Sequence, residues 1–91
     1  MPSRKATISN RLGLHARPAM LLAERASTFS STIEIARADA GDAVDGKSIM
    51  QLLMLAGTSG TVLKITAEGD DAAAALAAIA ELIERGFEDD E

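Results

Sequence analysis

TVLKITAEG, residues Thr61 to Gly69, is the stretch of sequence that decides the fold class. Apolar and polar side chains alternate strictly along it, so Leu63, Ile65 and Ala67 share one face while polar and charged residues share the other. This alternation is the pattern of a β-strand that buries one face and leaves the other in water, as strands of antiparallel sheets do. The sequence therefore predicts a sheet with one covered face and one open face.

The segment that follows, DDAAAALAAIAELIERG, predicts a helix over residues 70–86. Its apolar stripe is formed by Leu76, Ile79 and Ile83. The acids at its start complement the helix dipole, and Gly86 is a helix stop signal. A helix with one apolar stripe after a half-buried strand indicates a two-layer α+β domain, in which the stripe packs on the sheet.

Five further elements are predicted ahead of this strand–helix pair. They are strands at Lys5–Ser9, Ser31–Arg37 and Ala43–Asp45, a helix from Ala16 to about Thr28, and a helix that starts at Ser48. The order β-α-β-β-α-β-α predicts a four-stranded antiparallel sheet with three helices on one face, in a single domain of residues 1–91. A turn with Gly41 at its tip is expected between the second and third strands.

The composition excludes several classes of protein. The 91 residues include no cysteine and one histidine, so disulfides are excluded and a zinc site is not expected. A net charge of −5 with 2% aromatic residues argues against nucleic-acid binding. No stretch resembles a signal peptide or a membrane span. We therefore expect a cytoplasmic monomer without a cofactor or metal, whose acidic end, Phe87–Glu91, is frayed and solvated.

The single histidine lies in NRLGLHARPAMLLAERAS, residues Asn10 to Ser27, directly ahead of a helical pattern. His15 occupies the position of a helix N-cap, and the preceding glycine lets the chain turn tightly. The N–H groups of Ala16 and Arg17 would then point out of the helix start and form an anion site with the helix dipole. The Arg17 guanidinium suits phosphate, and a neutral imidazole is a nucleophile near neutral pH.

This grouping fits a site that holds a phosphoryl group as phosphohistidine and hands it on. An acyl-transfer triad is not expected, because the sequence carries no serine-elbow motif. The alternative that the spacing leaves open is a histidine that only caps the helix or lies on the surface.

The short segment SIMQLLML, residues Ser48 to Leu55, is apolar on nearly all sides. Ser48 and Gln51 form a Ser-x-x-Gln capping box, which predicts a helix start at Ser48. The positions that can face the core are Ile49, Leu52 and Ala56, and the outer positions are Met50, Leu53 and Met54. The outer residues either pack under loops or form an adaptable apolar patch for partners, which methionine suits.

Two stretches of the chain resemble one known family. GLHARPA (Gly13–Ala19) resembles the active-site signature of HPr, the histidine-containing phosphocarrier of the bacterial phosphotransferase system, and GKSIMQLLML (Gly46–Leu55) is similar to the serine-led helix of that family. The predicted elements agree with its open-faced β-sandwich. The resemblance implies a phosphoryl carrier rather than a turnover enzyme, with phosphate on Nδ1 of His15 and Arg17 as its electrostatic partner. It also implies phosphorylated enzyme I as the donor and an EIIA-type protein as the acceptor.

The resemblance further implies a docking face and a regulatory site. The docking face comprises Ala16, Met20, Glu24, Ile49, Met50, Leu53 and Met54. In many family members the serine that matches Ser48 is phosphorylated, which blocks transfer at the histidine. A serine kinase and a phosphatase are therefore further candidate partners.

Two features resemble the nitrogen-branch members of the family more than the sugar-transport carriers. Glu24 stands where the sugar-branch carriers tend to have lysine, and the chain ends in Gly-Phe followed by acids. The sequence leaves open which EIIA is served and whether sugar transport is involved. The first alternative function is a regulatory module that binds partners through its apolar patch without phosphoryl transfer. The second is a small-molecule-binding α+β domain, against which the scarcity of aromatic residues and the lack of a polar pocket signal argue.

Overall fold

The computed structural model describes residues 2–39, 42–55 and 58–88. Within these residues the chain forms four strands, three α-helices and a final 3₁₀ turn. In chain order they are β1 (Ser3–Thr7), α1 (Ala16–Ser27), β2 (Thr32–Arg37), β3 (Ala43–Asp45), α2 (Ile49–Met54), β4 (Val62–Glu68), α3 (Ala72–Glu84) and the turn Gly86–Glu88. This is the predicted order, while the turn tip expected at Gly41 lies outside the described residues.

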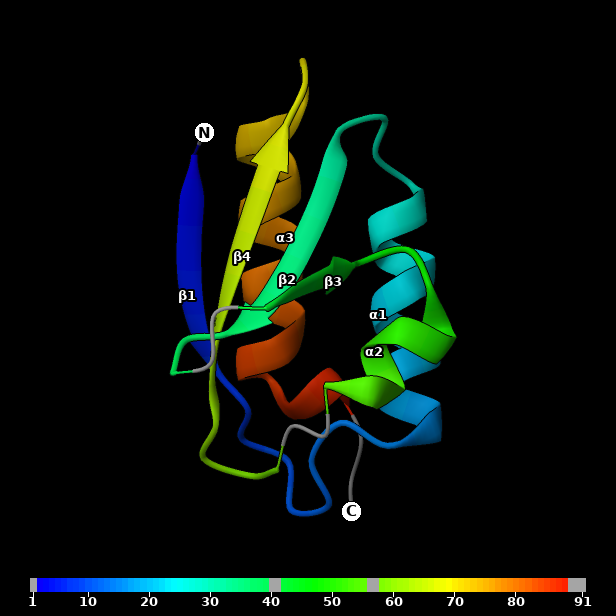
Figure 1. Cartoon of the computed structure of the whole chain (residues 1–91), viewed down its shortest axis with the longest axis vertical. Coiled ribbons are helices and arrows are strands. Elements are labelled where there is room, and N and C mark those ends of the chain that lie inside the picture. The colour runs from blue at the N-terminus through cyan, green and yellow to red at the C-terminus, as the bar shows by residue number, and fades with distance from the viewer. Residues whose placement is uncertain (1, 40–41, 56–57, 89–91) are drawn as a thin grey trace.

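The strands form one antiparallel sheet in the order β1-β4-β2-β3. Strand β4 is therefore paired on both edges, and the three-residue β3 forms the second edge of the sheet. Figure 1 shows α3 behind the long strands, with α1 beside it and α2 packed on α1. The predicted α+β architecture, a sheet with its helices on one face, is confirmed.

The alternation of the strands produces the core. Buried side chains on the helix-facing side of the sheet are Ala6, Ile33, Ile35, Leu63, Ile65 and Ala67. Those from α1 and α3 are Ala19, Leu22, Ala26, Leu76, Ile79 and Ile83, of which the last three are the predicted stripe. On the opposite side of the sheet, Lys5, Glu34 and Lys64 are exposed. One face of the sheet is thus dry and the other is open to water, as the pattern in Thr61–Gly69 predicts.

Strand β1 begins and ends two residues earlier than predicted. Its polar start, Ser3–Lys5, carries no apolar signal, yet it pairs with β4 in the register Ser3↔Thr66 to Thr7↔Val62. An edge strand can pair through its backbone whatever its side chains are, so the hydrophobic pattern underestimates its start. Ile8 is buried and still hydrogen-bonded to the loop ahead of β4, although it lies beyond the strand.

The acidic end of the chain was predicted to be frayed from Phe87 onward, and this prediction is wrong for Phe87. The aromatic side chain is buried in the core and lies beside Leu21 and Leu82. Gly86 and Phe87 have φ values of +67° and +60°, so two successive left-handed residues turn the chain back after α3. Burial of the large ring offsets the backbone strain that a non-glycine residue meets there. Residues 89–91 lie outside the described part of the chain.

The connection between β4 and α3 is fastened to the start of β2. Asp71 accepts hydrogen bonds from the backbone N–H groups of Ser30 (2.9 Å) and Ser31 (3.0 Å) and from the Ser31 hydroxyl. The Ser31 hydroxyl, followed by the Ser30 backbone N–H, lowers the pKa of the Asp71 carboxyl from 3.8 to about 2. Asp71 occupies the N-cap position of α3, but its side chain makes no capping hydrogen bond there.

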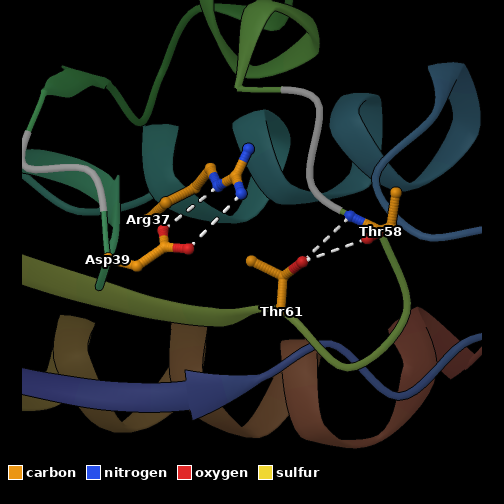
Figure 2. Close-up of polar contacts among 4 residues, drawn as sticks. All are labelled: Arg37, Asp39, Thr58 and Thr61. Carbon is orange, nitrogen blue, oxygen red and sulfur yellow. Dashed lines mark hydrogen bonds and ion pairs between the residues drawn. The ribbon is translucent and has the colours of Figure 1, made fainter.

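Two further polar pairs close loops at the end of the sheet, as Figure 2 shows. Thr58 N donates to Thr61 Oγ1 (3.1 Å) and Thr61 N donates to Thr58 O (3.0 Å), which folds the loop ahead of β4. Arg37 Nε lies 3.4 Å from Asp39 Oδ1 in an exposed ion pair. Exposed pairs of this kind contribute little to stability, so the hydrogen bonds of the threonine turn are the stronger restraint.

Replacement of Gly69 by alanine is expected to destabilise the fold strongly. Gly69 has φ +145°, and an added Cβ would lie 2.8 Å from the Ser31 Cα. We expect Gly69→Ala to lower the free energy of unfolding by about 2–5 kcal/mol, from backbone strain and overpacking together. Gly60→Ala is the matched control, since Gly60 also has positive φ (+92°) but no described atom lies within 4 Å of an added Cβ.

The control should lose only about 1–2 kcal/mol, the cost of the left-handed backbone alone. Urea denaturation measures both variants. Equal losses would contradict the close approach of Gly69 to Ser31.

Asp71 is expected to make the stability of the fold acid-sensitive. Because its pKa is lower in the folded protein than in the unfolded chain, the stabilisation is complete above the unfolded value and is lost as pH falls from about 4 to about 2. Asp71→Asn should therefore be less stable than the wild type at pH 7, and the difference should shrink towards pH 2. Urea midpoints measured from pH 7 to pH 2 test this, and a constant difference across that range would refute it.

Candidate functional site

The loop ahead of α1 is a tight turn with Asn10 at its start. Gly13 N donates to Asn10 O (3.1 Å), which closes a four-residue turn. Gly13, its last residue, has φ +74°, a left-handed conformation that glycine adopts without steric cost. The Gly13 carbonyl accepts two hydrogen bonds, from Asn10 Nδ2 (2.7 Å) and from His15 N (3.1 Å). The side chain of Asn10 is therefore linked to the backbone of His15 through one carbonyl group.

His15 is the N-cap residue of α1, as predicted. Its backbone is extended (φ −106°, ψ −163°), and its imidazole makes no capping hydrogen bond to the helix. The first helical hydrogen bond runs from Ala19 N to His15 O (2.9 Å). The backbone N–H groups of Ala16 and Arg17 precede that bond, and Pro18 has no N–H to contribute. These two amide groups and the positive end of the helix dipole therefore lie at the start of α1, next to His15 in the chain.

The imidazole is half-buried, and its Nε2 atom is buried. The side chain of Arg17, two residues along, is exposed at the start of the helix.

The predicted docking residues all lie at the surface. On α1, Ala16, Met20 and Glu24 are exposed at successive turns of the helix. On α2, the exposed side chains are Ile49 (41%), Met50 (76%), Leu53 (40%) and Met54 (77%). We call these seven residues the α1–α2 surface. Met50 and Met54 lie on the solvent side, so the interpretation in which both sides of α2 pack under loops is wrong for them.

The core-facing side of α2 differs from the predicted one. Leu52 and Leu55 are buried, whereas Ile49 is exposed. A six-residue helix packed against α1 buries little more than one row of side chains, so the side chain of its first residue remains exposed to solvent. Ala56, the third predicted core position, lies outside the described residues.

The structure brings the two predicted helices together in one shallow hollow of about 480 Å³. Its lining includes Glu24 and Ser27 from α1, and Lys47, Ser48 and Met50 from the start of α2. Lys47 was not predicted as a functional residue. Its Nζ donates to Phe29 O (2.9 Å), just past the end of α1, and so holds the two helices together. A lysine next to an N-cap serine gives no sequence signal for this contact.

The capping box predicted at Ser48 is only half present. Ser48 Oγ accepts a hydrogen bond from Gln51 N (3.3 Å), so the N-cap is confirmed. The Gln51 side chain does not return to Ser48, because its Oε1 accepts from Asp45 N (2.9 Å). The Ser48 N–H instead donates to Asp45 O (3.1 Å), which leaves the glutamine available to tie α2 to β3.

Neither a metal-ligand cluster nor a membrane-spanning helix occurs in the described part of the chain. The described residues contain no group of three or more histidine, cysteine, aspartate or glutamate side chains placed to hold a metal ion. None of their helices has the length and apolarity needed to cross a bilayer.

Comparison with known proteins identifies one family for the chain. Residues 2–85 match the family described as the PTS HPr component phosphorylation site. The chain belongs to the HPr family. The crystal structure of HPr-C-His from Thermoanaerobacter tengcongensis superposes with a TM-score of 0.90 at 41% identity and covers 100% of both chains. The predicted family and its open-faced fold are therefore confirmed.

Relatives from both branches of the HPr family are similar to the chain. Phosphocarrier protein NPr of Proteus mirabilis is 41% identical over 96% of both chains, and phosphocarrier protein HPr of Pseudomonas aeruginosa is 41% identical over 100% of both chains. The chain is thus a member of the HPr phosphocarrier family of the phosphotransferase system. The identity to the NPr relative equals the identity to the HPr relative.

Proposed function

We propose that the protein accepts a phosphoryl group from phosphorylated enzyme I on His15 and passes it to an EIIA-type protein in the cytoplasm. The observation that carries this proposal is the placement of His15, an N-cap residue whose imidazole does not cap its helix. Family membership in a phosphocarrier group supports the same role. The side chain is positioned at the helix start but is not used to satisfy its amides.

The transfer step follows from the two ring nitrogens. In the neutral imidazole one nitrogen carries the proton and the other carries a lone pair. With the proton on the buried Nε2, the lone pair of Nδ1 attacks phosphorus, the P–N bond forms, and the bond between phosphorus and the donor breaks. The same step in reverse passes the phosphoryl group to the acceptor.

The start of α1 supplies the charge that this group needs. The phosphoryl oxygens would face the N–H groups of Ala16 and Arg17 and the positive end of the helix dipole. The planar guanidinium of Arg17 adds up to two parallel hydrogen bonds to phosphate oxygens. These donors stabilise the dianion without forming a bond that must break before transfer.

We propose the α1–α2 surface as the docking site for both partners, and Ser48 as a site of regulation. The surface combines exposed methionines with Glu24 at its rim, and Ser48 lies in the hollow between the two helices. Phosphorylation of Ser48 by a kinase would add a charge of about −1.5 to −2 there, where a partner must desolvate the surface. Removal of that group by a phosphatase would restore docking.

Glu24 supports nitrogen-branch partners in particular. An acid at this exposed position would repel a partner rim that is itself acidic and would favour a basic or neutral one. Rim charges act mainly on association rates, so the preference is expected in kinetics rather than in an absolute choice of partner.

The first test of the function is His15→Ala. With phosphoenolpyruvate, enzyme I and Mg²⁺, we expect the wild type to gain an acid-labile, base-stable phosphate and the variant to gain none. Because His15 is a half-buried residue outside the hydrophobic core, the variant should keep the wild-type fold. Mass spectrometry after the reaction, with circular dichroism as the folding control, measures both. Full phosphorylation of a folded His15→Ala would refute the proposal.

The docking and regulatory proposals predict a separation of binding from stability. Ser48→Asp keeps a good N-cap, so its free energy of unfolding should stay within about 0.5 kcal/mol of the wild type. Binding of enzyme I should weaken by about 1–3 kcal/mol, because the new charge is desolvated without a partner. Met50→Ala is the companion variant, and it should also weaken binding with little effect on folding, since Met50 is 76% exposed.

Isothermal titration calorimetry with enzyme I and urea denaturation give the two quantities for each variant. Wild-type binding by Ser48→Asp would place α2 outside the interface.

A further inference from the structure

Asn10 shares a hydrogen-bond acceptor with His15. The Gly13 carbonyl receives both Asn10 Nδ2, at 2.7 Å, and His15 N, at 3.1 Å. The same two residues, Asn10 and Gly13, are also joined through their backbones by the turn hydrogen bond of 3.1 Å. The position of the Gly13 carbonyl, and with it the start of α1, is therefore determined partly by one side chain.

Burial makes this amide unusual within the described residues. Asn10 is 6% exposed, and it and Ser31 are the two buried polar residues of the described chain. Ser31 is accounted for by its hydrogen bonds to Asp71. The Asn10 Oδ1 is buried with no hydrogen-bond partner among the described residues. An unpaired buried acceptor destabilises a fold, so an apolar residue of similar shape would suit the core better.

We infer that Asn10 is a positioning residue for phosphoryl transfer, which sets the place of the His15 imidazole through the Gly13 carbonyl. The inference rests on the proposed function. The unpaired Oδ1 lowers the stability of the fold, but an apolar residue at this position could not donate a hydrogen bond to the carbonyl that also accepts from the His15 N–H. Displacement of a reacting group by about 1 Å can lower a rate by as much as 100-fold, so a restraint one hydrogen bond from His15 is effective.

The other side of the same loop provides a matched control. Ser9 Oγ donates to Glu84 O (3.0 Å) at the end of α3, and an added Cβ on Gly86 would lie 3.5 Å from both Ser9 Oγ and Asn10 Cβ. Ser9 thus ties the loop to the end of α3, and Asn10 ties two residues of the loop to each other. The Ser9 hydroxyl reaches α3 rather than the Gly13 carbonyl, so its removal loosens the loop while the hydrogen bond from Asn10 to that carbonyl stays in place.

The test compares Asn10→Leu with Ser9→Ala in single-turnover transfer from phosphorylated enzyme I. Leucine has nearly the shape of asparagine and removes the unpaired Oδ1 together with the Nδ2 donor. We expect its melting temperature within about 5 °C of the wild type, and a transfer rate lower by roughly tenfold or more. Ser9→Ala should transfer within about twofold of the wild-type rate. An equal loss of rate in Ser9→Ala would overturn the inference, because any loosening of the loop would then suffice.

A second variant and a second measurement keep the test decisive. Asn10→Asp preserves the shape but replaces the NH₂ donor with an oxygen, so it should lose rate as Asn10→Leu does. In both variants, NMR should show shifted signals for the His15 backbone amide and imidazole ring, and unshifted ones in Ser9→Ala. Wild-type transfer rates, or wild-type His15 signals, in a folded Asn10 variant would overturn the inference. If the wild type accepts no phosphoryl group, the proposed function fails and the His15 signals alone decide the role of Asn10.

Discussion

The pairing of β4 on both of its edges is the constraint on which the rest of the structure depends. Its buried face, Leu63, Ile65 and Ala67, forms the middle of the core, and the helices cover that face. Helix α3 follows directly through the turn at Gly69 and packs back on the same side. At the other end of β4, Ile8 N donates to Thr61 O (2.9 Å) and Gly60 N donates to Ile8 O (2.8 Å). The loop that carries His15 therefore begins next to Ile8, whose backbone is hydrogen-bonded to the residues just ahead of β4.

The N-cap residues of the three helices differ in what their side chains do. Ser48 caps α2 with its side chain, whereas His15 and Asp71 occupy N-cap positions without capping. The Asp71 carboxylate instead fastens the β4–α3 connection to the start of β2. The His15 imidazole is the group that we propose as the phosphoryl acceptor. A cap contributes about 1 kcal/mol, so a small domain can forgo it at two helices that large apolar contacts already hold.

Helix α2 illustrates a second compromise between stability and binding. A six-residue helix is far too short to be stable alone, and it leaves four large apolar side chains in water. It is held by the Ser48 cap, by the bond of Lys47 to the end of α1, by Gln51 on the β3 backbone, and by the burial of Leu52 and Leu55. These restraints let the exposed side remain apolar, which is what a docking surface needs.

The sequence by itself determined the elements whose signal is local. Strict alternation in Thr61–Gly69 and the stripe of Leu76, Ile79 and Ile83 identified β4 and α3, and the two motifs around His15 and Ser48 identified the family. Periodicity reports which side of an element is dry, so these predictions needed no knowledge of neighbours.

Tertiary structure alone decided the features that depend on partners distant in sequence. Ser3 and Arg4 join β1 because β4 offers a backbone to pair with. Phe87 is buried because two left-handed residues turn the chain back after α3. The Asp71 carboxylate accepts hydrogen bonds from Ser31 and Ser30, which lie 40 and 41 residues earlier in the chain. The Gln51 side chain accepts from Asp45 N instead of completing the capping box with Ser48. Asp71 and Gln51 are both at helix starts where a local capping hydrogen bond was possible, and only the packed chain brings the other partner close enough to compete with it.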